Sequence, residues 1–573
     1  TSVTTIAPQV CAHRPTLHRI PLCQPLQRHD HHHPDHHHRQ RLRARRRSHG
    51  PHSLLAVPAN PARSYDPQGR EISYAEAAAQ VHGLMQHYRA AGYGLGHRVG
   101  LFLESRPEHL LHKLALNTLG VCVVPINPDY RPPALAYLID HARVDLVVAL
   151  PTRLPAVRAA LAEARHQPPV ATPDDMAALP PPAQPAQAGA PQADTPASIL
   201  YTSGTTGQPK GCVLSHRYEL AAGDWYARRG GMVAIREGQE RLYNPLPLFH
   251  VNASILSFYC MLLTGGCQVQ TDRFAPSRWW QEVCESRATI VHYLGVVVPM
   301  LLAQPASPLE RAHSVRFGYG AGVEPQLHAV FEERFGLPLV ELWGMTEIVR
   351  VISDHHAPRQ IGTRAFGRAE PGLEVCVVDE AGTEVADGQP GEMWVRHSAA
   401  TPRKDFFSGY LNDPEATEAA WRGGWFHTGD IVTRDASGML RFMDRRKNII
   451  RRSGENIAAA EVEALLLTHP LVHQAAVMAV PDAVREEEVL ACVVLDPAAA
   501  AGMAHADAAR TLQAFCLREL AYYKAPGWWW FADEIPTTGT QKIQKHRIFP
   551  AGSDPRALAG MVDLCALKKR PVR

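Results

Sequence analysis

The sequence predicts an α/β fold with a large N-terminal domain of α/β subdomains and a smaller C-terminal α/β domain. From about residue 72, β-branched apolar runs alternate with amphipathic helical segments, which is typical of sheets covered by helices. A second α/β pattern begins after about residue 443. Hydrophobic residues make up 45% of the 573 residues and charged residues 20%, which supplies a large core and excludes a mostly disordered chain.

The first elements alternate between helix and strand. A Ser cap, apolar residues at helical spacing and a terminal Gly predict a helix at Ser73–Gly92. Short β-branched runs predict strands at Arg98–Leu103, Val121–Asn127 and Val144–Leu150, and a helical pattern at His109–Gly120 separates the first two. Because strands joined through helices pair in parallel, these segments predict a parallel sheet with helices on its faces.

The C-terminal part has its own order of elements. A helix is predicted at 458–469, strands at 474–481 and 488–495, and a further helix at 508–520. Together they form a separate unit of about 110 residues. Upstream, residues 167–196 are rich in Pro, Ala and Gln and predict a loose surface connector.

The first 52 residues differ in composition from the rest. They contain the tract HDHHHPDHHH at His29–His38 and nine Arg against two Asp, without helical or strand periodicity. Composition favours a disordered tail that is dispensable for activity; the alternatives are a metal-binding tract, a polyanion-binding arm or an artefact of the reading frame. Without this tail the chain is mildly acidic, so no nucleic-acid partner is expected.

The remaining composition indicates a cytoplasmic protein without integral membrane association. The longest apolar stretches, 255–263 and 296–303, are much shorter than the roughly 18–20 residues of a membrane helix. The first residues lack the apolar core of a secretory signal. Eleven scattered Cys form no Cys-x-x-Cys pair, so we expect free thiols in a reducing compartment.

The strongest local signal is SILYTSGTTGQPKGCVLSH, at Ser198–His216. An apolar run leads into Thr, Ser and Gly residues with a single Lys. Gly residues let backbone N–H groups face an anion, hydroxyl groups add donors, and Lys210 adds a positive charge. The spacing differs from that of the G-x-x-x-x-G-K-[ST] loop. The segment therefore predicts a polyphosphate site of another kind, with a flexible surface loop as the alternative.

Seven motifs, in order, resemble those of the adenylate-forming (AMP-binding) enzymes, which include acyl-CoA synthetases, firefly luciferase and nonribosomal-peptide adenylation domains. After the loop come YGAGVEP (319–325), ELWGMTE (341–347), GEMWVRH (391–397) and GWFHTGD (424–430). DRRKNIIRRSGENIAAAEVE (444–463) and PTTGTQKIQK (536–545) complete the order. The resemblance covers about residues 53–565. Within the family the chain is most similar to the acyl-CoA synthetase branch, and there to crotonobetaine/carnitine-CoA ligases.

The resemblance implies ATP, Mg²⁺ and coenzyme A as cofactors or co-substrates. Attack of a carboxylate on the α-phosphate of ATP brings two anions together, so fixed donors and positive charge are needed. Lys542 is expected to bridge the two anions, Glu347 and Thr205 to bind Mg²⁺, and Thr346 and His250 to complete the catalytic set. The motifs imply ATP or AMP binding by Thr202, Ser203, Gly204, Thr205, Thr206, Gly207, Lys210, Gly320, Ala321, Gly322, Glu341, Leu342, Trp343, Gly344, Met345, Asp430 and Arg445.

The same resemblance predicts the domain boundaries. Residues 1–52 are the disordered His/Arg-rich tail, 53–443 the adenylation domain that binds ATP and the acyl group, 444–447 the hinge, 448–565 a mobile C-terminal domain with the catalytic lysine, and 566–573 a basic tail. The expected hinge residue is Lys447, and the residues expected to contact coenzyme A are Arg451, Arg452, Ser453 and Gly454.

Two positions depart from the family pattern. Gln541 stands where Gly usually precedes the catalytic lysine, and we expect altered loop geometry without loss of function. Cys212 stands where a β-branched residue is more common, and we expect a small buried hydrophobe there.

The expected function is that of an ATP-dependent acyl-CoA ligase, which converts a carboxylic acid to acyl-AMP and transfers the acyl group to coenzyme A. The alternatives are an acyl-adenylate ligase that loads a carrier protein and, from another class, a non-catalytic nucleotide- or metal-binding protein. Residues 546–573 are too few for a fused carrier domain of roughly 70–80 residues. The sequence leaves open whether the protein forms a homodimer.

One segment of the sequence limits the class of carboxylic acid that is expected as the substrate. Leu242–Phe258 resembles the lining of the family's acyl pocket, and residues 249–254 lack the Asp that would hold an α-ammonium group. This pattern favours a short or medium fatty acid, an aryl acid or a betaine over an amino acid. For a betaine, Trp279, Trp280 and Tyr293 are the candidates for a cage around the quaternary ammonium group.

Overall fold

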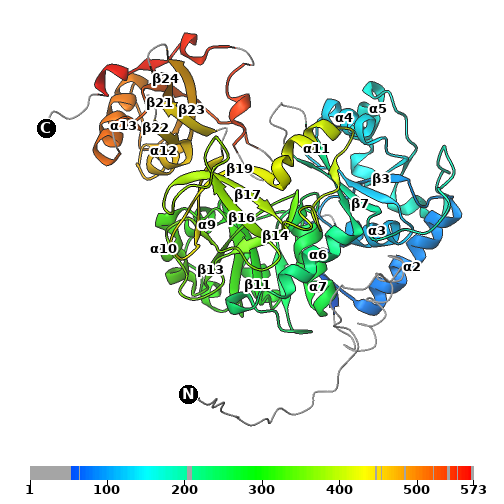
Figure 1. Cartoon of the computed structure of the whole chain (residues 1–573). Helices are drawn as coiled ribbons and strands as arrows, with labels where there is room; N and C mark the ends of the chain where they lie inside the picture. The colour runs from blue at the N-terminus through cyan, green and yellow to red at the C-terminus, as the bar shows by residue number, and fades with distance from the viewer. Residues whose placement is uncertain are drawn as a thin grey trace, which may run out of the picture.

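In the computed structural model, the described part of the chain forms four β-sheets with helices around them (Figure 1). The described residues are 53–568 without positions 64, 203–208, 446–447, 453–454, 483–484, 521, 538–542 and 551–552, and the side chains of residues 349, 451, 455, 456, 486 and 546 are not described. The α/β class predicted from the sequence is confirmed.

The first sheet has seven strands in the order β18-β8-β7-β4-β3-β5-β6. The strands β3 to β7 pair in parallel, whereas β8 is antiparallel to both β7 and β18. Their bounds are β3 (Arg98–Phe102), β4 (Cys122–Pro125), β5 (Leu146–Ala149), β6 (Val170–Ala171), β7 (Pro196–Thr202), β8 (Lys210–Ser215) and β18 (Gly409–Tyr410). The associated helices are α2 (Tyr74–Ala90), α3 (Pro107–Thr118), α4 (Pro132–Ala142) and α5 (Leu154–Glu163).

The predicted elements of this sheet lie within a few residues of the observed ones. Ser73 caps α2: its hydroxyl accepts from the Glu76 amide, and the Glu76 carboxylate accepts from the Ser73 amide at 2.8 Å. This reciprocal pairing satisfies backbone donors that the first helical turn leaves open. The predicted connector at 167–196 contains the short strand β6 and a 3₁₀ turn, η2 (Pro173–Ala178).

The second sheet has eight strands in the order β14-β13-β12-β11-β9-β10-β1-β2. All pairs are parallel except the two at the edges, β13 with β14 and β1 with β2. The strands are β1 (Ser53–Val57), β2 (Arg70–Ser73), β9 (Arg241–Asn244), β10 (Cys267–Gln270), β11 (Ile290–Leu294), β12 (Phe317–Ala321), β13 (Leu339–Met345) and β14 (Ile348–Ser353). The helical segments are α6 (His216–Ala227), the π-helix η4 (Asn252–Ser257), α7 (Phe258–Thr264), α8 (Trp279–Glu285), α9 (Val297–Leu302) and α10 (Pro325–Phe335).

The third sheet is antiparallel, in the order β15-β20-β19-β17-β16. It consists of β15 (Ala365–Gly367), β16 (Glu374–Val378), β17 (Pro390–Arg396), β19 (Phe426–Arg434) and β20 (Leu440–Arg445), with α11 (Pro414–Ala420) between β18 and β19.

The fourth sheet is formed by residues 449–563. Its strands are β21 (Ile449–Arg452), β22 (Glu455–Ala458), β23 (Val472–Asp482), β24 (Glu486–Leu495), β25 (Trp528–Phe531) and β26 (Val562–Asp563), and its helices are α12 (Ala459–Leu466) and α13 (His505–Glu519). The predicted helices and strands of this part lie within a few residues of α12, β23, β24 and α13.

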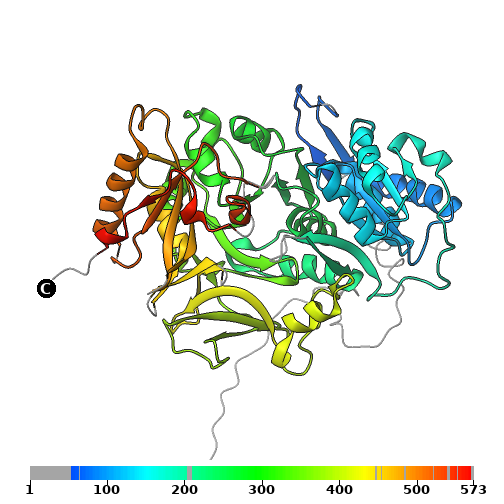
Figure 2. The same cartoon turned by 90° about the horizontal axis from the view of Figure 1, so that it is seen from above.

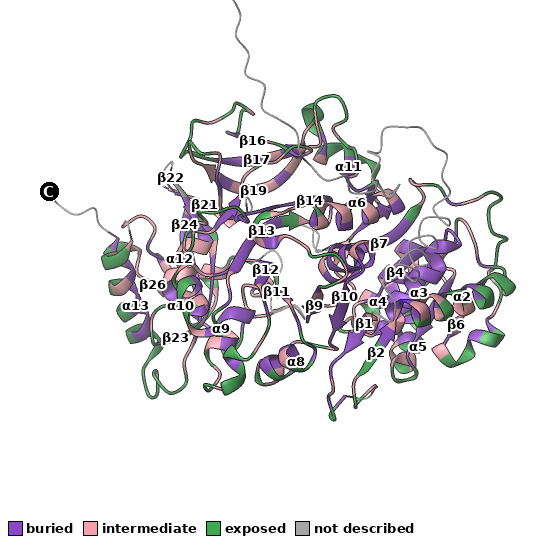
Figure 3. Cartoon of the chain, turned by 90° about the horizontal axis from the view of Figure 1, so that it is seen from below, coloured by how far each residue is buried: buried purple, intermediate pink, exposed green. Residues whose placement is uncertain are grey.

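The small C-terminal unit lies beside the third sheet, at the opposite end of the molecule from the first sheet (Figure 2). The strands are mostly buried, and the exposed residues gather on the outer faces of peripheral helices such as α2 and α13 (Figure 3). Among the described residues, no helix combines the length and the apolar character needed to cross a membrane.

Candidate active site

The strands β7 and β8 hold the two ends of the predicted polyphosphate loop together. Thr202 on β7 pairs with Lys210 on β8, so the loop between them starts and ends at the same point of the first sheet. The Lys210 ammonium lies 3.9 Å from Asp413 Oδ2 and 4.9 Å from the centroid of the Tyr410 ring. The loop residues predicted to bind phosphate lie outside the described residues: Ser203, Gly204, Thr205, Thr206 and Gly207.

The predicted metal ligand Glu347 is connected to this lysine through Tyr410. Its side chain is buried, and the Tyr410 hydroxyl donates to Glu347 Oε1 at 2.8 Å. Burial raises the pKa of the Tyr410 phenol, so the hydroxyl keeps the proton that it donates. Because Tyr410 also contacts Lys210, one aromatic ring joins the predicted phosphate lysine and the predicted metal ligand.

The other residues of the 341–347 motif lie on β13 and in the turn after it. The backbone carbonyl of Thr346 accepts a hydrogen bond from the Tyr218 hydroxyl on α6 at 2.7 Å. Gly344 is exposed, and Met345 and Leu342 are half-buried. In this turn Thr346 is half-buried, whereas Glu347 is buried and points toward Tyr410.

The chemistry of Glu347 fits Mg²⁺. Mg²⁺ binds oxygen ligands and commonly takes one or two carboxylates together with substrate phosphates. Glu347 supplies a carboxylate within the same cluster as the Lys210 ammonium. Its predicted companion, Thr205, lies outside the described residues.

The predicted ribose-binding residue Asp430 is fully buried, in β19. The indole N–H of Trp343 donates to Asp430 Oδ2 at 2.7 Å, and Arg445 Nε lies 2.6 Å from Asp430 Oδ1. Arg445 faces Asp430 across the β19–β20 pair. The structure thus brings together three predicted ATP-binding residues from β13, β19 and β20.

The predicted adenine turn at residues 320–322 is packed tightly against β11. A Cβ added to Gly320 would lie 2.2 Å from the backbone oxygen of Tyr293, and one added to Gly295 would lie 1.9 Å from that of Gly322. Gly322 itself has φ +88°, which L side chains rarely adopt. Glycine is therefore needed at these positions for the two strand ends to meet.

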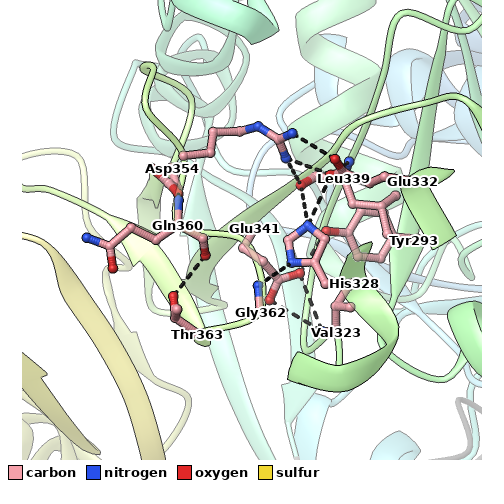
Figure 4. Close-up of polar contacts among 11 residues, drawn as sticks. Tyr293, Val323, His328, Glu332, Leu339, Glu341, Asp354, Gln360, Gly362 and Thr363 are labelled. Carbon is pink, nitrogen blue, oxygen red and sulfur yellow. Dashed lines mark hydrogen bonds and ion pairs between the residues drawn. The ribbon is translucent and has the colours of Figure 1, made fainter. Parts of the chain in front are cut away.

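Glu341 supports this turn from β13 (Figure 4). Its carboxylate accepts from the Gly322 amide at 3.0 Å, from the Val323 amide at 3.3 Å and from the Tyr293 hydroxyl at 2.7 Å. Burial raises the pKa of Glu341 to about 7, and the three donors oppose that rise. Glu341 therefore connects β11, the 322–323 turn and β13.

A second network in Figure 4 supports the start of β13. Arg359 donates to both carboxylate oxygens of Glu332, at 2.7 and 2.9 Å, and to the Leu339 carbonyl at 2.9 Å. The paired guanidinium and its hydrogen bonds lower the pKa of Glu332 to about 2, although burial opposes them. This bidentate pair fixes the C-terminal end of α10 against β13.

His250 precedes the π-helix η4. Its backbone carbonyl accepts from the Ser254 hydroxyl at 2.8 Å, and its half-buried ring lies 4.5 Å from the Phe249 ring, centroid to centroid. Two residues later, the Asn252 side-chain oxygen lies 2.7 Å from His292 Nδ1, and His292 Nε2 lies 3.1 Å from the Tyr226 hydroxyl. Burial lowers the pKa of His292 to about 3, so this ring is neutral. A buried polar network therefore continues inward from the predicted acyl segment.

The proposed betaine cage is wrong. Trp279 and Trp280 are buried in an apolar cluster, where Trp279 packs on Tyr243 and Trp280 on Phe335. Tyr293 directs its hydroxyl to Glu341. Both indoles are buried among core side chains, which the sequence does not reveal, and so they are not free to surround a cation.

The C-terminal residues are only partly described. Lys542, Gln541, Lys447, Ser453 and Gly454 lie outside the described residues, as does the side chain of Arg451. Arg452 is buried, and its Nε lies 2.8 Å from Glu488 Oε2. Lys568, in the predicted basic tail, is buried and pairs with the other oxygen of Glu488. Arg452 and Lys568 thus share the single carboxylate of Glu488 within the C-terminal unit.

Two tyrosines of the site were not identified from the sequence. Tyr410 and Tyr218 lie outside the quoted motifs, and they reach Glu347 and Thr346 through long-range packing. Tyr410 follows Glu347 by 63 residues and reaches it through the β18–β8 pair, which places Tyr410 opposite Cys212. Cys212 itself is buried, as predicted.

Comparison with known proteins shows the family to which this chain belongs. Residues 53–411 match the family described as AMP-binding enzyme, and residues 461–542 match the AMP-binding enzyme C-terminal domain. A sulfoacetate–CoA ligase from Cupriavidus necator is 34% identical over 84% of this chain and 92% of its own length. A crotonobetaine/carnitine–CoA ligase from Citrobacter koseri is 29% identical over 84% and 93%. ATP-bound MatB from Rhodopseudomonas palustris has a TM-score of 0.74 and 27% identity, with 90% of this chain and 98% of that chain covered.

Proposed function

We propose that this chain, which belongs to the AMP-binding enzyme family, is an ATP-dependent acyl-CoA ligase for a short carboxylic acid that carries a polar group. A family match over both parts of the chain carries the proposal. The grouping of Lys210, Glu347, Asp430 and Arg445 supports it, because these residues supply charge and hydrogen bonds suited to a nucleoside triphosphate.

In the first step, the acid carboxylate attacks the α-phosphate of ATP and pyrophosphate leaves. Lys210 supplies positive charge beside the polyphosphate, and Thr346 offers a hydroxyl donor at the turn after β13. Asp430 accepts from the ribose hydroxyls and Arg445 pairs with the same region. Glu347 would hold Mg²⁺, which neutralises phosphate charge when it is bound. The role of Lys542, bridging carboxylate and α-phosphate, rests on its sequence motif.

In the second step, the thiol of coenzyme A attacks the acyl carbonyl and AMP leaves. The burial of Arg452 against Glu488 argues that this side chain supports the C-terminal unit and does not contact coenzyme A directly. We therefore assign coenzyme A contacts in this segment to Arg451, Ser453 and Gly454, from the sequence motif alone.

Two observations support a short acid with a polar group. The named relatives act on sulfoacetate and on crotonobetaine or carnitine, whose carboxylates accompany a second charged group. In this chain the segment after His250 leads into the buried Asn252–His292–Tyr226 network, and we infer that these polar groups suit a polar acyl group better than a long alkyl chain.

The experiment is pyrophosphate release across a panel of acids, each with and without coenzyme A. The panel contains sulfoacetate, malonate, carnitine, crotonobetaine, butyrate, octanoate and benzoate. We expect multiple turnovers only with coenzyme A, and the highest kcat/KM on a short acid with a second polar group. Highest activity on octanoate or benzoate would contradict the acid assignment. Release that coenzyme A leaves unchanged would point to a carrier protein as acceptor.

The lysine assignment has a separate test. Lys542→Ala should abolish acyl-AMP formation and leave acyl transfer from preformed acyl-AMP to coenzyme A largely intact. A matched control is Lys524→Ala, because Lys524 pairs with Glu461 within the C-terminal unit. Equal loss of both half-reactions in Lys542→Ala would contradict the assignment.

A further inference from the structure

Three side chains that commonly bind transition metals converge beyond the end of β14, outside the residues assigned to ATP. They are His355, His356 and Glu370, and their ligand atoms all lie within 4.8 Å of one another. His355 Nε2 lies 3.1 Å from Glu370 Oε1, and His356 Nε2 lies 4.0 Å from the same oxygen. Two imidazole nitrogens thus lie close to the same carboxylate oxygen.

His355 is held in an orientation suited to a ligand. Its side chain is 1% exposed, and its Nδ1 donates to the backbone carbonyl of Ser353 at 2.8 Å. This bond directs Nε2 toward Glu370, and histidines that bind metals usually donate their other ring N–H in this way. Nε2 lies at ion-pair distance from Glu370 Oε1, so an imidazolium–carboxylate pair holds the two side chains in this arrangement when no metal is bound. A metal ion between the three groups would replace the proton of that pair and use the same two atoms as ligands.

Glu370 is also fixed by its surroundings. Arg229 donates to Glu370 Oε2, so the other oxygen is left facing the two imidazoles. The Arg229 guanidinium lies 3.5 Å from the centroid of the Trp225 ring, which holds it in place. A cation on the far oxygen weakens the carboxylate as a ligand, so the arrangement favours moderate rather than very tight metal binding.

The donor set and its spacing suit Zn²⁺. Zn–N and Zn–O bonds of about 2.0–2.2 Å in a tetrahedron place the ligand atoms roughly 3.3 Å apart, and the His355–Glu370 pair already has this spacing. His356 has 62% of its side chain exposed, so it is free to approach by the remaining distance. Its exposure also leaves room for water as a fourth ligand. Mg²⁺ and Ca²⁺ prefer all-oxygen sites, which two imidazoles do not provide.

We propose that His355, His356 and Glu370 form a Zn²⁺ site that ties the end of β14 to the segment before β16. This site is separate from the proposed Mg²⁺ ligand Glu347 and does not depend on the identity of the acid. Since β14 pairs with β13, which carries Trp343 and Glu341, Zn²⁺ bound here stabilises the edge of the sheet that supports the nucleotide site.

The test is hydrogen–deuterium exchange of the full chain with and without Zn²⁺. We expect Zn²⁺ to slow exchange at least threefold in peptides that cover residues 354–372. This readout is local, so metal bound by the His29–His38 tract does not contribute to it. The tract peptides serve as an internal comparison in every variant.

Three variants complete the experiment. His356→Gln changes an exposed side chain and should fold normally, yet it should remove the protection of 354–372; Glu370→Gln should do the same. His87→Gln, on the exposed face of α2, is the matched control and should keep the protection. Protection confined to the tract peptides, or protection that persists in His356→Gln, would overturn the proposal.

Discussion

Two kinds of buried carboxylate occur in this molecule. Glu219 and Glu488 are completely buried and are paired with buried cations: Lys113 lies 2.5 Å from Glu219, and Arg452 and Lys568 both contact Glu488. Glu347 and Asp430 are buried to a similar degree, but their partners differ. Glu347 accepts from the half-buried Tyr410, and Asp430 pairs with Arg445, whose side chain is 38% exposed.

The difference separates structural from functional carboxylates. A carboxylate enclosed with its cation cannot exchange partners unless the core opens, since each charge would lose its only compensation in a medium of low polarity. A carboxylate whose partners reach solvent can take a new partner, such as a ribose hydroxyl or a metal ion, at little cost. Burial is thus similar in these four carboxylates, and the exposure of their partners is what differs between the two pairs.

The largest expected effect is the loss of an enclosed cation. Lys113→Met leaves the Glu219 carboxylate buried without a charge partner, so we expect the free energy of unfolding to fall by about 3–5 kcal/mol. Urea unfolding measures the change. The double variant Lys113→Met/Glu219→Leu should recover part of the loss, because apolar residues of similar volume replace a buried pair well. A double variant less stable than Lys113→Met would show that the pair is not the source of the effect.

For a functional carboxylate we expect a large loss of activity with little loss of stability. Glu347→Gln is expected to reduce kcat by about 10²–10³-fold and to raise the Mg²⁺ concentration needed for half-maximal rate, with the unfolding midpoint nearly unchanged. Steady-state rates across a Mg²⁺ titration measure this. Glu374→Gln, at a half-exposed position that pairs with Arg396 on the third sheet, is the control. If Glu347→Gln unfolds as readily as Lys113→Met, Glu347 belongs with the structural carboxylates.

Glu341 shares features with both the structural and the functional carboxylates, and the pH dependence of stability tests which kind it resembles. Burial raises its folded-state pKa from 4.5 to about 7, so the folded protein binds more protons than the unfolded chain between these values. The contribution of Glu341 to the free energy of unfolding should therefore fall as pH rises from 4.5 to 7, by up to about 3 kcal/mol. Glu341→Gln, which does not titrate, should flatten this dependence. If the free energy of unfolding has the same pH dependence in Glu341→Gln as in the unsubstituted protein, the raised pKa of Glu341 is ruled out.

The smallest expected effect concerns the orientation of Asp430. Trp343→Phe removes the indole N–H that donates to Asp430 while keeping an aromatic ring, so about 1 kcal/mol of ATP binding should be lost. This corresponds to a roughly fivefold higher KM for ATP with kcat nearly unchanged. Trp425→Phe, at a half-buried position beside Arg396, is the control. An unchanged KM would mean that Arg445 alone orients Asp430.

Much of the fold and the site could be predicted from local sequence. Periodic apolar patterns and caps placed α2, α3, β3, β4 and β5, because helix and strand periodicity depends on neighbours within a few residues. The ordered motifs placed Lys210, the 341–347 segment, Asp430 and Arg445 in one site. The structure brings Trp343, Asp430 and Arg445 into contact, and Tyr410 lies between Lys210 and Glu347.

The rest was decided by tertiary structure. Tyr410 contacts Glu347 through a two-stranded pairing between β18 and β8, and that pairing joins residues about 200 positions apart without a local pattern. From the sequence, Trp279 and Trp280 were candidates to bind a ligand cation, but the second sheet and its helices enclose them. The sequence suggests a surface position for Arg452, but in the structure it is buried and pairs with Glu488 on another strand.

The physical reason is the range of the interactions. Local sequence determines which residues form an element and which chemical groups a motif carries. Whether a charged or aromatic side chain ends at a ligand or in the core depends on which distant strand supplies its partner, and that is fixed only when the sheets assemble.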